Sequence, residues 1–215
     1  MEWTIAVFIM ALVAMVLHES AHALVAFCLG DETAKRQGRL TLNPLKHLDP
    51  MMSVALPVFL AMIHAPIFGG AKPVPVDSRF LKGGKWGMAL VAIAGPLTNF
   101  VLAFISFALA CALGFFLHGA TLPNNFMALL LLAGLQVNLG FAIFNILPLP
   151  PLDGSRVLMA LAPDFMQPVF AFLERYALVV LFCLVFGMAG ALDRVMFAMY
   201  QGALQLFYAI IGLPG

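Results

Sequence analysis

The chain has 215 residues, of which 63% are hydrophobic and only 10% are charged. A soluble domain of this size is usually near half apolar and a quarter charged, so this composition excludes an ordinary soluble protein. The formal net charge of +1 gives no basis for binding nucleic acid through its phosphates. We therefore expect a single all-α domain, residues 1–215, that crosses a membrane several times.

Apolar runs along the chain predict the transmembrane helices. Five of them are long enough to cross a bilayer at about 1.5 Å per residue, and they cover residues 3–29, 88–117, 126–147, 168–190 and 194–213. A shorter run, 51–68, contains two prolines, and we expect a re-entrant or interfacial element there, with a sixth span as the alternative. The last run contains Tyr200, Gln201 and Gln205, so whether it crosses fully stays open. These runs predict about five to six transmembrane helices.

The connections between the runs differ in charge. Residues 31–50 and 72–87 each carry four Lys or Arg residues, whereas 118–125 carry none. The positive-inside rule then predicts that both basic connections are cytoplasmic. Within the first connection, the alternating pattern of 38–44 favours a short strand or hairpin. The prolines of 72–84 favour a loop.

Three cysteines, Cys28, Cys111 and Cys183, lie in apolar stretches without Cys-x-x-Cys spacing. We expect them to be buried small apolar side chains rather than metal ligands or disulfides.

The segment VLHESAHALVAF, residues 16–27, contains a histidine, a glutamate and a second histidine within an apolar run. HExxH on a helix puts His18 and His22 on one face, where both rings can bind one metal ion. Glu19 lies about 100° round the helix, free to act as general base on a water whose pKa the metal lowers to about 7. A charged residue costs about 2.5–3.5 kcal/mol at the middle of a bilayer. This cost favours a functional site over a pair of packed core histidines.

A catalytic zinc ion needs a third protein ligand and one open position. His47, His64 and His118 are candidates, as is an acidic residue within the membrane. The best candidate is Asp153, because three prolines between 148 and 151 break the preceding helix and Gly154 lets the chain turn. This bend is expected at the cytoplasmic end of its span, at the depth of the HExxH motif. The alternative is a turn residue in water.

Two asparagines lie in or at the end of predicted spans. Asn145 has two possible roles, donation to the oxyanion of a tetrahedral intermediate or a hydrogen bond to an adjacent helix. Asn99, in AGPLTNF (94–100), is expected to pack helices together, because Ala94 and Gly95 permit close approach.

Several of these motifs, in this order, resemble those of the site-2 proteases, the intramembrane zinc metalloproteases. HESAH (18–22) is similar to the zinc motif of the family, and NILPLPPLDG (145–154) is similar to its second motif. Bacterial members also have segments similar to LNPLKHLDP (42–50), GGAKPVPV (69–76) and AGPLTNF (94–100). The resemblance covers about residues 14–160 and is more specific than HExxH alone.

The resemblance implies one zinc ion on His18, His22 and Asp153, with Glu19 as the catalytic acid and base and Asn145 as a substrate or oxyanion contact. It also implies hydrolysis of peptide bonds in transmembrane protein substrates, often after a first protease has removed the outer domain. Residues 38–50 would then meet an extended substrate by strand addition. The expected location is the bacterial inner membrane, with the active site toward the cytoplasm.

The sequence departs from the family pattern in two respects. Ser155 stands where many members have a second glycine, and no PDZ domain fits within the chain, so we expect a minimal member. Two other functions stay open. One is a metal-ion transporter, which would need polar residues along several helices. The other is a proteolytically inactive homologue that binds membrane proteins.

Overall fold

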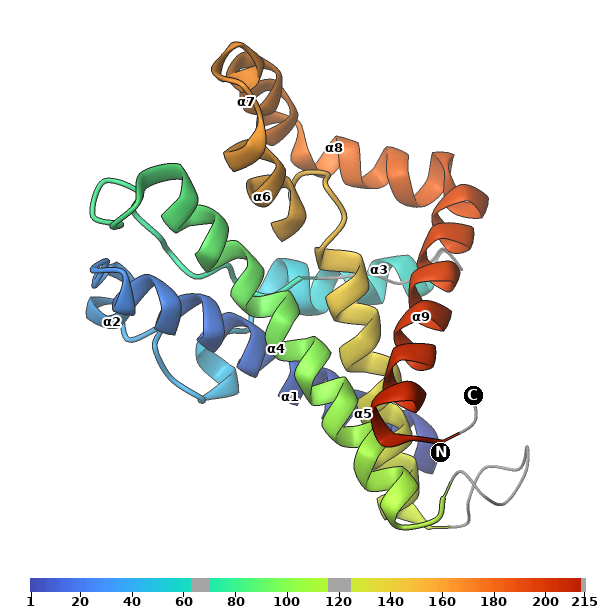
Figure 1. Ribbon diagram of the computed structural model, residues 1–215. Helices are drawn as coiled ribbons and strands as arrows, with labels where there is room; N and C mark the ends of the chain where they lie inside the picture. Colours follow the sequence, from blue (N-terminus) through green and yellow to red (C-terminus); the bar gives the residue numbers. More distant parts are fainter. Residues whose placement is uncertain (63–69, 116–124, 214–215) are drawn as a thin grey trace.

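Three long helices form the core of the protein (Figure 1). The computed structural model describes residues 1–62, 70–115 and 125–213, and these residues form helices and irregular segments without a strand. The core helices are α1 (Glu2–Cys28), α4 (Gly84–Ala112) and α5 (Phe126–Asn145), and each packs against the other two. All three are long and apolar enough to cross a membrane. The all-α class is therefore confirmed, and three of the expected spans are helices of sufficient length and apolarity.

Small side chains bring the three core helices together. Alanines make up most of their buried apolar side chains, and small residues let helix backbones approach closely in a membrane. These alanines include Ala14, Ala23 and Ala26 on α1, Ala92, Ala94 and Ala103 on α4, and Ala133 and Ala142 on α5. Polar side chains on these faces therefore lie within hydrogen-bonding distance of a neighbouring helix.

The expected span 168–190 is not one straight helix. It consists of α7 (Gln167–Arg175), α8 (Ala177–Phe182) and η4 (Cys183–Gly187), with a bend of 80° between α7 and the helix that follows. Tyr176, with φ −109° and ψ 25°, has left the helical conformation and marks the bend. By length and composition the described residues contain three spanning helices, or four if the bent pair is one span. This number is lower than the five to six expected from the apolar runs.

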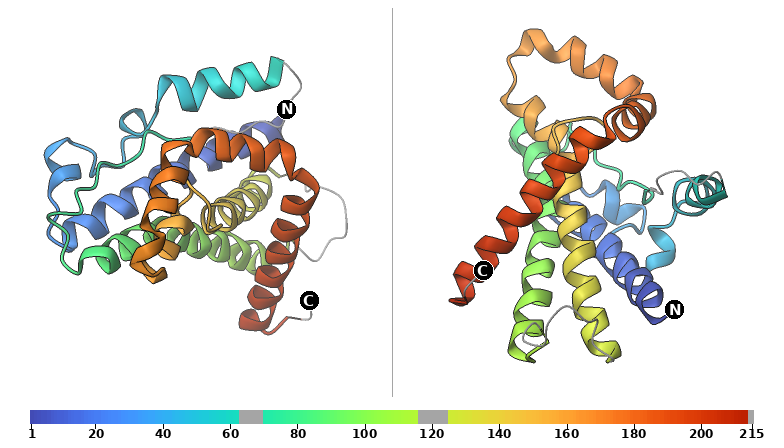
Figure 2. Two further views of the ribbon diagram at one scale, coloured as in Figure 1. Left: turned by 90° about the horizontal axis from the view of Figure 1, so that it is seen from above. Right: turned by 90° about the vertical axis from the view of Figure 1, so that its right-hand side faces the viewer.

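The last helix, α9 (Ala189–Ile211), is outside the set of helices long and apolar enough to span. It crosses beside α4 and α5 (Figure 2) and is attached by Phe207, which is completely buried. The Phe207 ring lies 5.1 to 5.7 Å from the rings of Phe100, Phe104 and Phe107 on α4. Aromatic contact therefore joins this helix to the core.

The first basic connection contains short helices rather than the expected strand or hairpin. These are α2 (Thr33–Arg36) and η1 (Pro44–Lys46), and the run that follows forms η2 (Pro50–Ala55) and α3 (Leu56–Met62). The strand predicted at 38–44 is absent from the described residues. The carbonyl of Thr41 accepts hydrogen bonds from the Ser20 hydroxyl at 2.9 Å and from His47 Nε2 at 2.8 Å, so side chains take the place of a partner strand. Residues 63–68 of the run 51–68 lie outside the described residues.

The second basic connection has no helix before Gly84, as its prolines predicted. This segment, residues 70–77, is attached to the first connection. The N–H of Lys72 donates to the carbonyl of His47 at 2.8 Å, and the N–H of Asp77 donates to the buried carboxylate of Asp31 at 2.7 Å. We call residues 70–77 the extended segment.

The prediction that the cysteines are buried is wrong for two of the three. Cys28 and Cys183 are exposed, and Cys111 is half-buried. A membrane explains the difference, because an apolar side chain that faces lipid has no need of protein cover.

Candidate active site

Helix α1 supplies two histidines that face the interior of the protein. His18 and His22 lie one helical turn apart, so both rings project from the same face. Their ring centroids are 4.6 Å apart with the planes nearly perpendicular, and both residues are buried. This pair is the one predicted from the HExxH spacing.

Asp153 reaches the histidines from the first position of α6 (Asp153–Leu161). Helix α5 ends at Asn145, and the proline-rich turn then leads the chain back beside α4. The turn is tight at Gly154, where a Cβ atom would lie 2.1 Å from the carbonyl oxygen of Ile146. Glycine is therefore required beside Asp153 because a side chain has no room there, rather than for the free backbone turn expected from the sequence, since residue 154 already belongs to α6.

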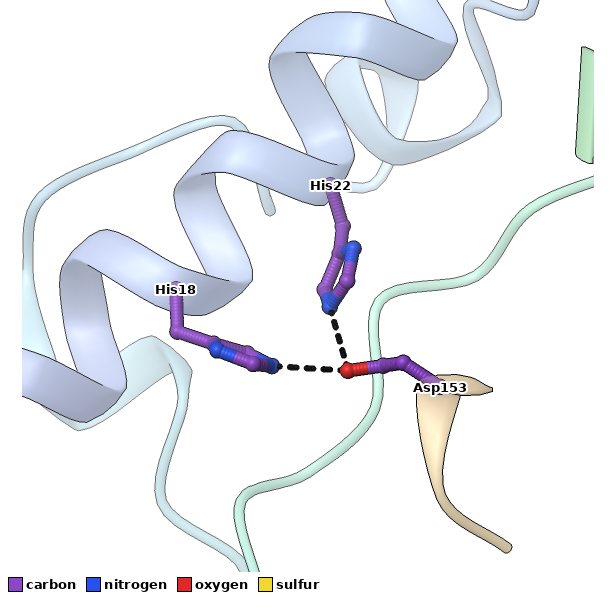
Figure 3. Close-up of side chains that lie close together, drawn as sticks. All are labelled: His18, His22 and Asp153. Atoms are coloured by element: carbon purple, nitrogen blue, oxygen red, sulfur yellow. Dashed lines mark hydrogen bonds and ion pairs between the residues drawn. The ribbon is translucent and has the colours of Figure 1, made fainter. Parts of the chain in front are cut away.

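The side chains of these three residues converge (Figure 3). One carboxylate oxygen of Asp153, Oδ2, lies 3.1 Å from Nε2 of His18 and 3.4 Å from Nε2 of His22. Ligand atoms at about 2.0–2.1 Å from one tetrahedral zinc ion would be about 3.3–3.4 Å apart. The three residues therefore fit a zinc ion, and the Asp153 side chain keeps 20% of its surface exposed.

Gly95 on α4 provides the space for the two rings. A Cβ atom at this position would lie 2.5 Å from Nε2 of His22 and 2.6 Å from Nε2 of His18. The α4 backbone thus passes directly behind the atoms that would bind the metal. The sequence suggested only helix packing for this glycine.

The other nitrogen of each ring is also hydrogen-bonded. Nδ1 of His22 donates to the carbonyl of Val91 at 2.7 Å, and Nδ1 of His18 lies 2.5 Å from Oδ1 of Asn99. Both Nε2 atoms are thereby left with a lone pair directed at Asp153. The prediction for Asn99 named helix packing and missed this contact. An uncharged amide in an apolar span, four residues after Gly95, was the available signal.

Glu19 lies outside the group of three ligands. Its Oε2 atom accepts a hydrogen bond from the N–H of Val74, in the extended segment, at 3.1 Å. Pro73 and Pro75 have no N–H, so Val74 supplies the only backbone donor at these three positions. The extended segment therefore contacts the predicted general base.

Curated relatives share most of this sequence. The chain is 39% identical over 206 residues to "Putative zinc metalloprotease YwhC" of Bacillus subtilis, covering 93% of this chain and 89% of the relative. The chain belongs to the site-2 protease family of zinc metalloproteases. It is also 33% identical over 184 residues to "Putative zinc metalloprotease Rip2" of Mycobacterium tuberculosis, covering 85% of this chain and 66% of that relative. No family model matches the chain, and no solved structure matches it.

The hydrogen bonds of the other described candidates, Asn145 and His47, are to residues other than His18, His22 and Asp153. The Asn145 amide donates to the carbonyl of Phe141, within its own helix, at 3.0 Å. His47 is completely buried in the first basic connection, bonded to Thr41. His64 and His118 lie outside the described residues. Among the described residues, the group of three or more metal-binding side chains consists of His18, His22 and Asp153.

Proposed function

We propose that this site-2 protease is an intramembrane metalloprotease that hydrolyses peptide bonds in the transmembrane segments of other membrane proteins. The observation that carries the proposal is the convergence of His18, His22 and Asp153, whose ligand atoms lie within 4.8 Å of one another. The two histidines belong to a helix long and apolar enough to cross a membrane. A substrate that is itself within the bilayer is therefore the class of protein that reaches them.

In the proposed mechanism each residue has a separate role. When bound, one zinc ion would polarise the scissile carbonyl and lower the pKa of the attacking water to about 7. His18, His22 and Asp153 would hold the ion. Glu19 takes a proton from the attacking water and passes it to the leaving amine. The N–H of Val74 holds Oε2 of Glu19, which leaves Oε1 to carry the proton.

Asn145 is the candidate contact to the oxyanion or to the substrate. Its amide donates to a carbonyl of its own helix. This role therefore requires the side chain to rotate away from Phe141 when a substrate binds.

A cavity of about 290 Å³ lies at the start of α6, where Ser155 and Arg156 rather than Asp153 itself line it, and we propose that water approaches from this side. It lies between the proline-rich turn and α7, where Arg156 and Glu174 form an ion pair at 3.8 Å. Its lining residues are Pro150, Pro151, Ser155, Arg156, Glu174 and Ala177. We propose that the protein is a multi-pass protein of the bacterial cell membrane, with this side of the active site toward the cytoplasm.

The experiment combines zinc content with peptide cleavage. Wild type, Glu19→Gln and Asp153→Ala are purified, analysed for zinc and mixed in proteoliposomes with single-span peptides that carry helix-breaking residues. The glutamine amide of Glu19→Gln still accepts the Val74 N–H but takes no proton. We expect about one zinc per chain in wild type and Glu19→Gln, with cleavage by wild type alone. Asp153→Ala should lose both zinc and cleavage.

Three other results would contradict this proposal. Full cleavage by Glu19→Gln would exclude the assigned role of Glu19. Zinc-loaded wild type that cleaves none of the peptides would favour the inactive, membrane-protein-binding homologue. Metal-dependent release of ions from the proteoliposomes without cleavage would favour the transporter.

A further inference from the structure

Two asparagines are completely buried in the core of the protein. Asn99 on α4 and Asn138 on α5 have no exposed surface, although uncharged amides are costly to bury in apolar surroundings unless each polar atom is paired. They contact each other, since Nδ2 of Asn99 lies 2.8 Å from Oδ1 of Asn138. The pair joins three helices, because Nδ2 of Asn99 also lies 3.3 Å from the carbonyl of Ala14 on α1.

The hydrogen-bond partners fix the direction of this chain of amides. Nδ2 of Asn138 donates to the carbonyl of Gly134 at 2.9 Å, so its Oδ1 faces Asn99. An amide oxygen can only accept, so Asn99 must turn its Nδ2 toward Asn138. Its own Oδ1 then faces Nδ1 of His18 at 2.5 Å. That nitrogen must carry the hydrogen, which leaves the lone pair of a neutral His18 on Nε2.

His22 needs no side-chain partner to set its tautomer. Its Nδ1 donates to the carbonyl of Val91, a backbone atom whose direction is set by helix α4. An acceptor on a side chain differs, because an Asn amide that turns by 180° presents a donor in place of an acceptor. An inverted Asn99 would favour the His18 tautomer with hydrogen on Nε2, the atom that faces Asp153.

We propose that Asn99 and Asn138 are positioning residues for zinc binding, and that Asn138 acts by holding Asn99 in the orientation that sets the tautomer of His18. This inference rests on the proposed function. Partners of metal-binding histidines typically affect metal affinity by about 10–100-fold. If the two amides only joined helices, their loss would lower stability without a matching selective loss of zinc affinity.

The test measures zinc affinity by competition with a chromophoric chelator in detergent, and thermal unfolding of the zinc-free protein alongside it. We expect Asn99→Leu to weaken zinc binding by about 10–100-fold, and Asn138→Leu to weaken it less. Ser106→Ala is the matched control. Ser106 is also a buried polar residue of α4, but it packs near Gly134 rather than His18. The control should bind zinc as wild type does.

A double variant separates positioning from packing. In Asn99→Asp, either oxygen of the new carboxylate can only accept, so its orientation toward His18 needs no partner. This variant loses the donations to Asn138 and Ala14, so its own zinc affinity, rather than that of wild type, is the reference for the double variant. Asn138→Leu should then have no further effect on zinc affinity when it is added to Asn99→Asp. The effect of Asn138→Leu on zinc affinity is therefore measured in wild type and in Asn99→Asp. Comparison of these two effects tests the inference even if Asn99→Leu does not fold.

The inference is overturned if folded Asn99→Leu binds zinc as tightly as wild type. It is equally overturned if Asn138→Leu lowers zinc affinity by the same factor in both backgrounds. In either case a wild type that binds zinc and cleaves peptides leaves the proposed function intact. A wild type that binds no zinc would overturn both the proposed function and this inference.

Discussion

At the scale of single residues, the missing side chain at position 95 matters as much as the ligands themselves. An added methyl group would lie 2.5–2.6 Å from ring atoms of His18 and His22, a distance at which the rings must move apart. We therefore expect Gly95→Ala to lose its zinc and all cleavage, measured by elemental analysis and by the peptide assay.

Gly140→Ala is the control for this substitution. Gly140 lies on α5, and a Cβ atom there would meet nothing within 4 Å. This variant should keep its zinc and gain up to about 1 kcal/mol of helix stability. A Gly95→Ala protein that still holds zinc would contradict the assignment of Gly95 as the space behind the ligands.

A residue of the site is easier to predict when the residues that it works with are close to it in the sequence. His18, Glu19 and His22 follow from spacing within one helix. Asp153 could be predicted because a catalytic zinc ion needs a third ligand and because the preceding prolines predict a bend. The contact of Asn99 with His18 joins residues 81 positions apart. It depends on how α4 is rotated against α1, and neither apolar pattern sets that rotation.

At the scale of elements, the extended segment depends on the carboxylate of Asp31. Burial opposes ionisation of this carboxyl group, but hydrogen bonds from Thr33 and from the N–H of Asp77 outweigh burial and hold the pKa of Asp31 below its usual value of 3.8. A carboxyl group with a lowered pKa stabilises the fold at a pH above its unfolded pKa. That stabilisation is lost as the pH falls below about 4 toward the folded pKa.

We expect wild type to be more stable than Asp31→Asn at pH 6, and the difference to shrink by pH 3. Thermal unfolding of the zinc-free proteins in detergent measures it without a contribution from the metal. Glu32→Gln alters an exposed neighbour that is paired with Arg36. This control should lose stability between pH 6 and pH 3 as wild type does. A difference between wild type and Asp31→Asn that stays constant from pH 6 to pH 3 would exclude this role of Asp31.

Two of the three core helices were predictable to within two residues and α4 (Gly84–Ala112) to within about five of the run 88–117, because one continuous apolar run specifies each. The run 3–29 became α1 (Glu2–Cys28), and 126–147 became α5 (Phe126–Asn145). The bend at Tyr176 was missed, since no proline or glycine marks it. The strand at 38–44 was expected from a local pattern, but a strand also needs a partner, and Ser20 and His47 bind the Thr41 carbonyl instead.

At the scale of the whole molecule, the charge of the connections predicts an orientation in the membrane. Cysteine-free protein carrying Ser78→Cys or Asn125→Cys tests it in spheroplasts, with a maleimide that does not cross membranes. The first site lies in the second basic connection and the second site precedes α5. Asn125→Cys should react in intact spheroplasts, and Ser78→Cys only after permeabilisation. The reverse pattern would contradict the cytoplasmic location of the basic connections.

The position of Asp153 on a separate element has a consequence for the lifetime of the protein. His18 and Asp153 are 135 positions apart, so a zinc ion bound between them is a reversible cross-link that closes most of the chain into a ring. Free zinc at 100 times its dissociation constant would add about 2.7 kcal/mol to the free energy of unfolding. A chelator should therefore lower the Tm of wild type and leave that of Asp153→Ala unchanged, and equal shifts would exclude the cross-link. On the proposed function, loss of zinc would remove the link between α1 and α6 together with the activity, and we expect the zinc-free protein to be degraded faster by the proteases that clear unfolded membrane proteins.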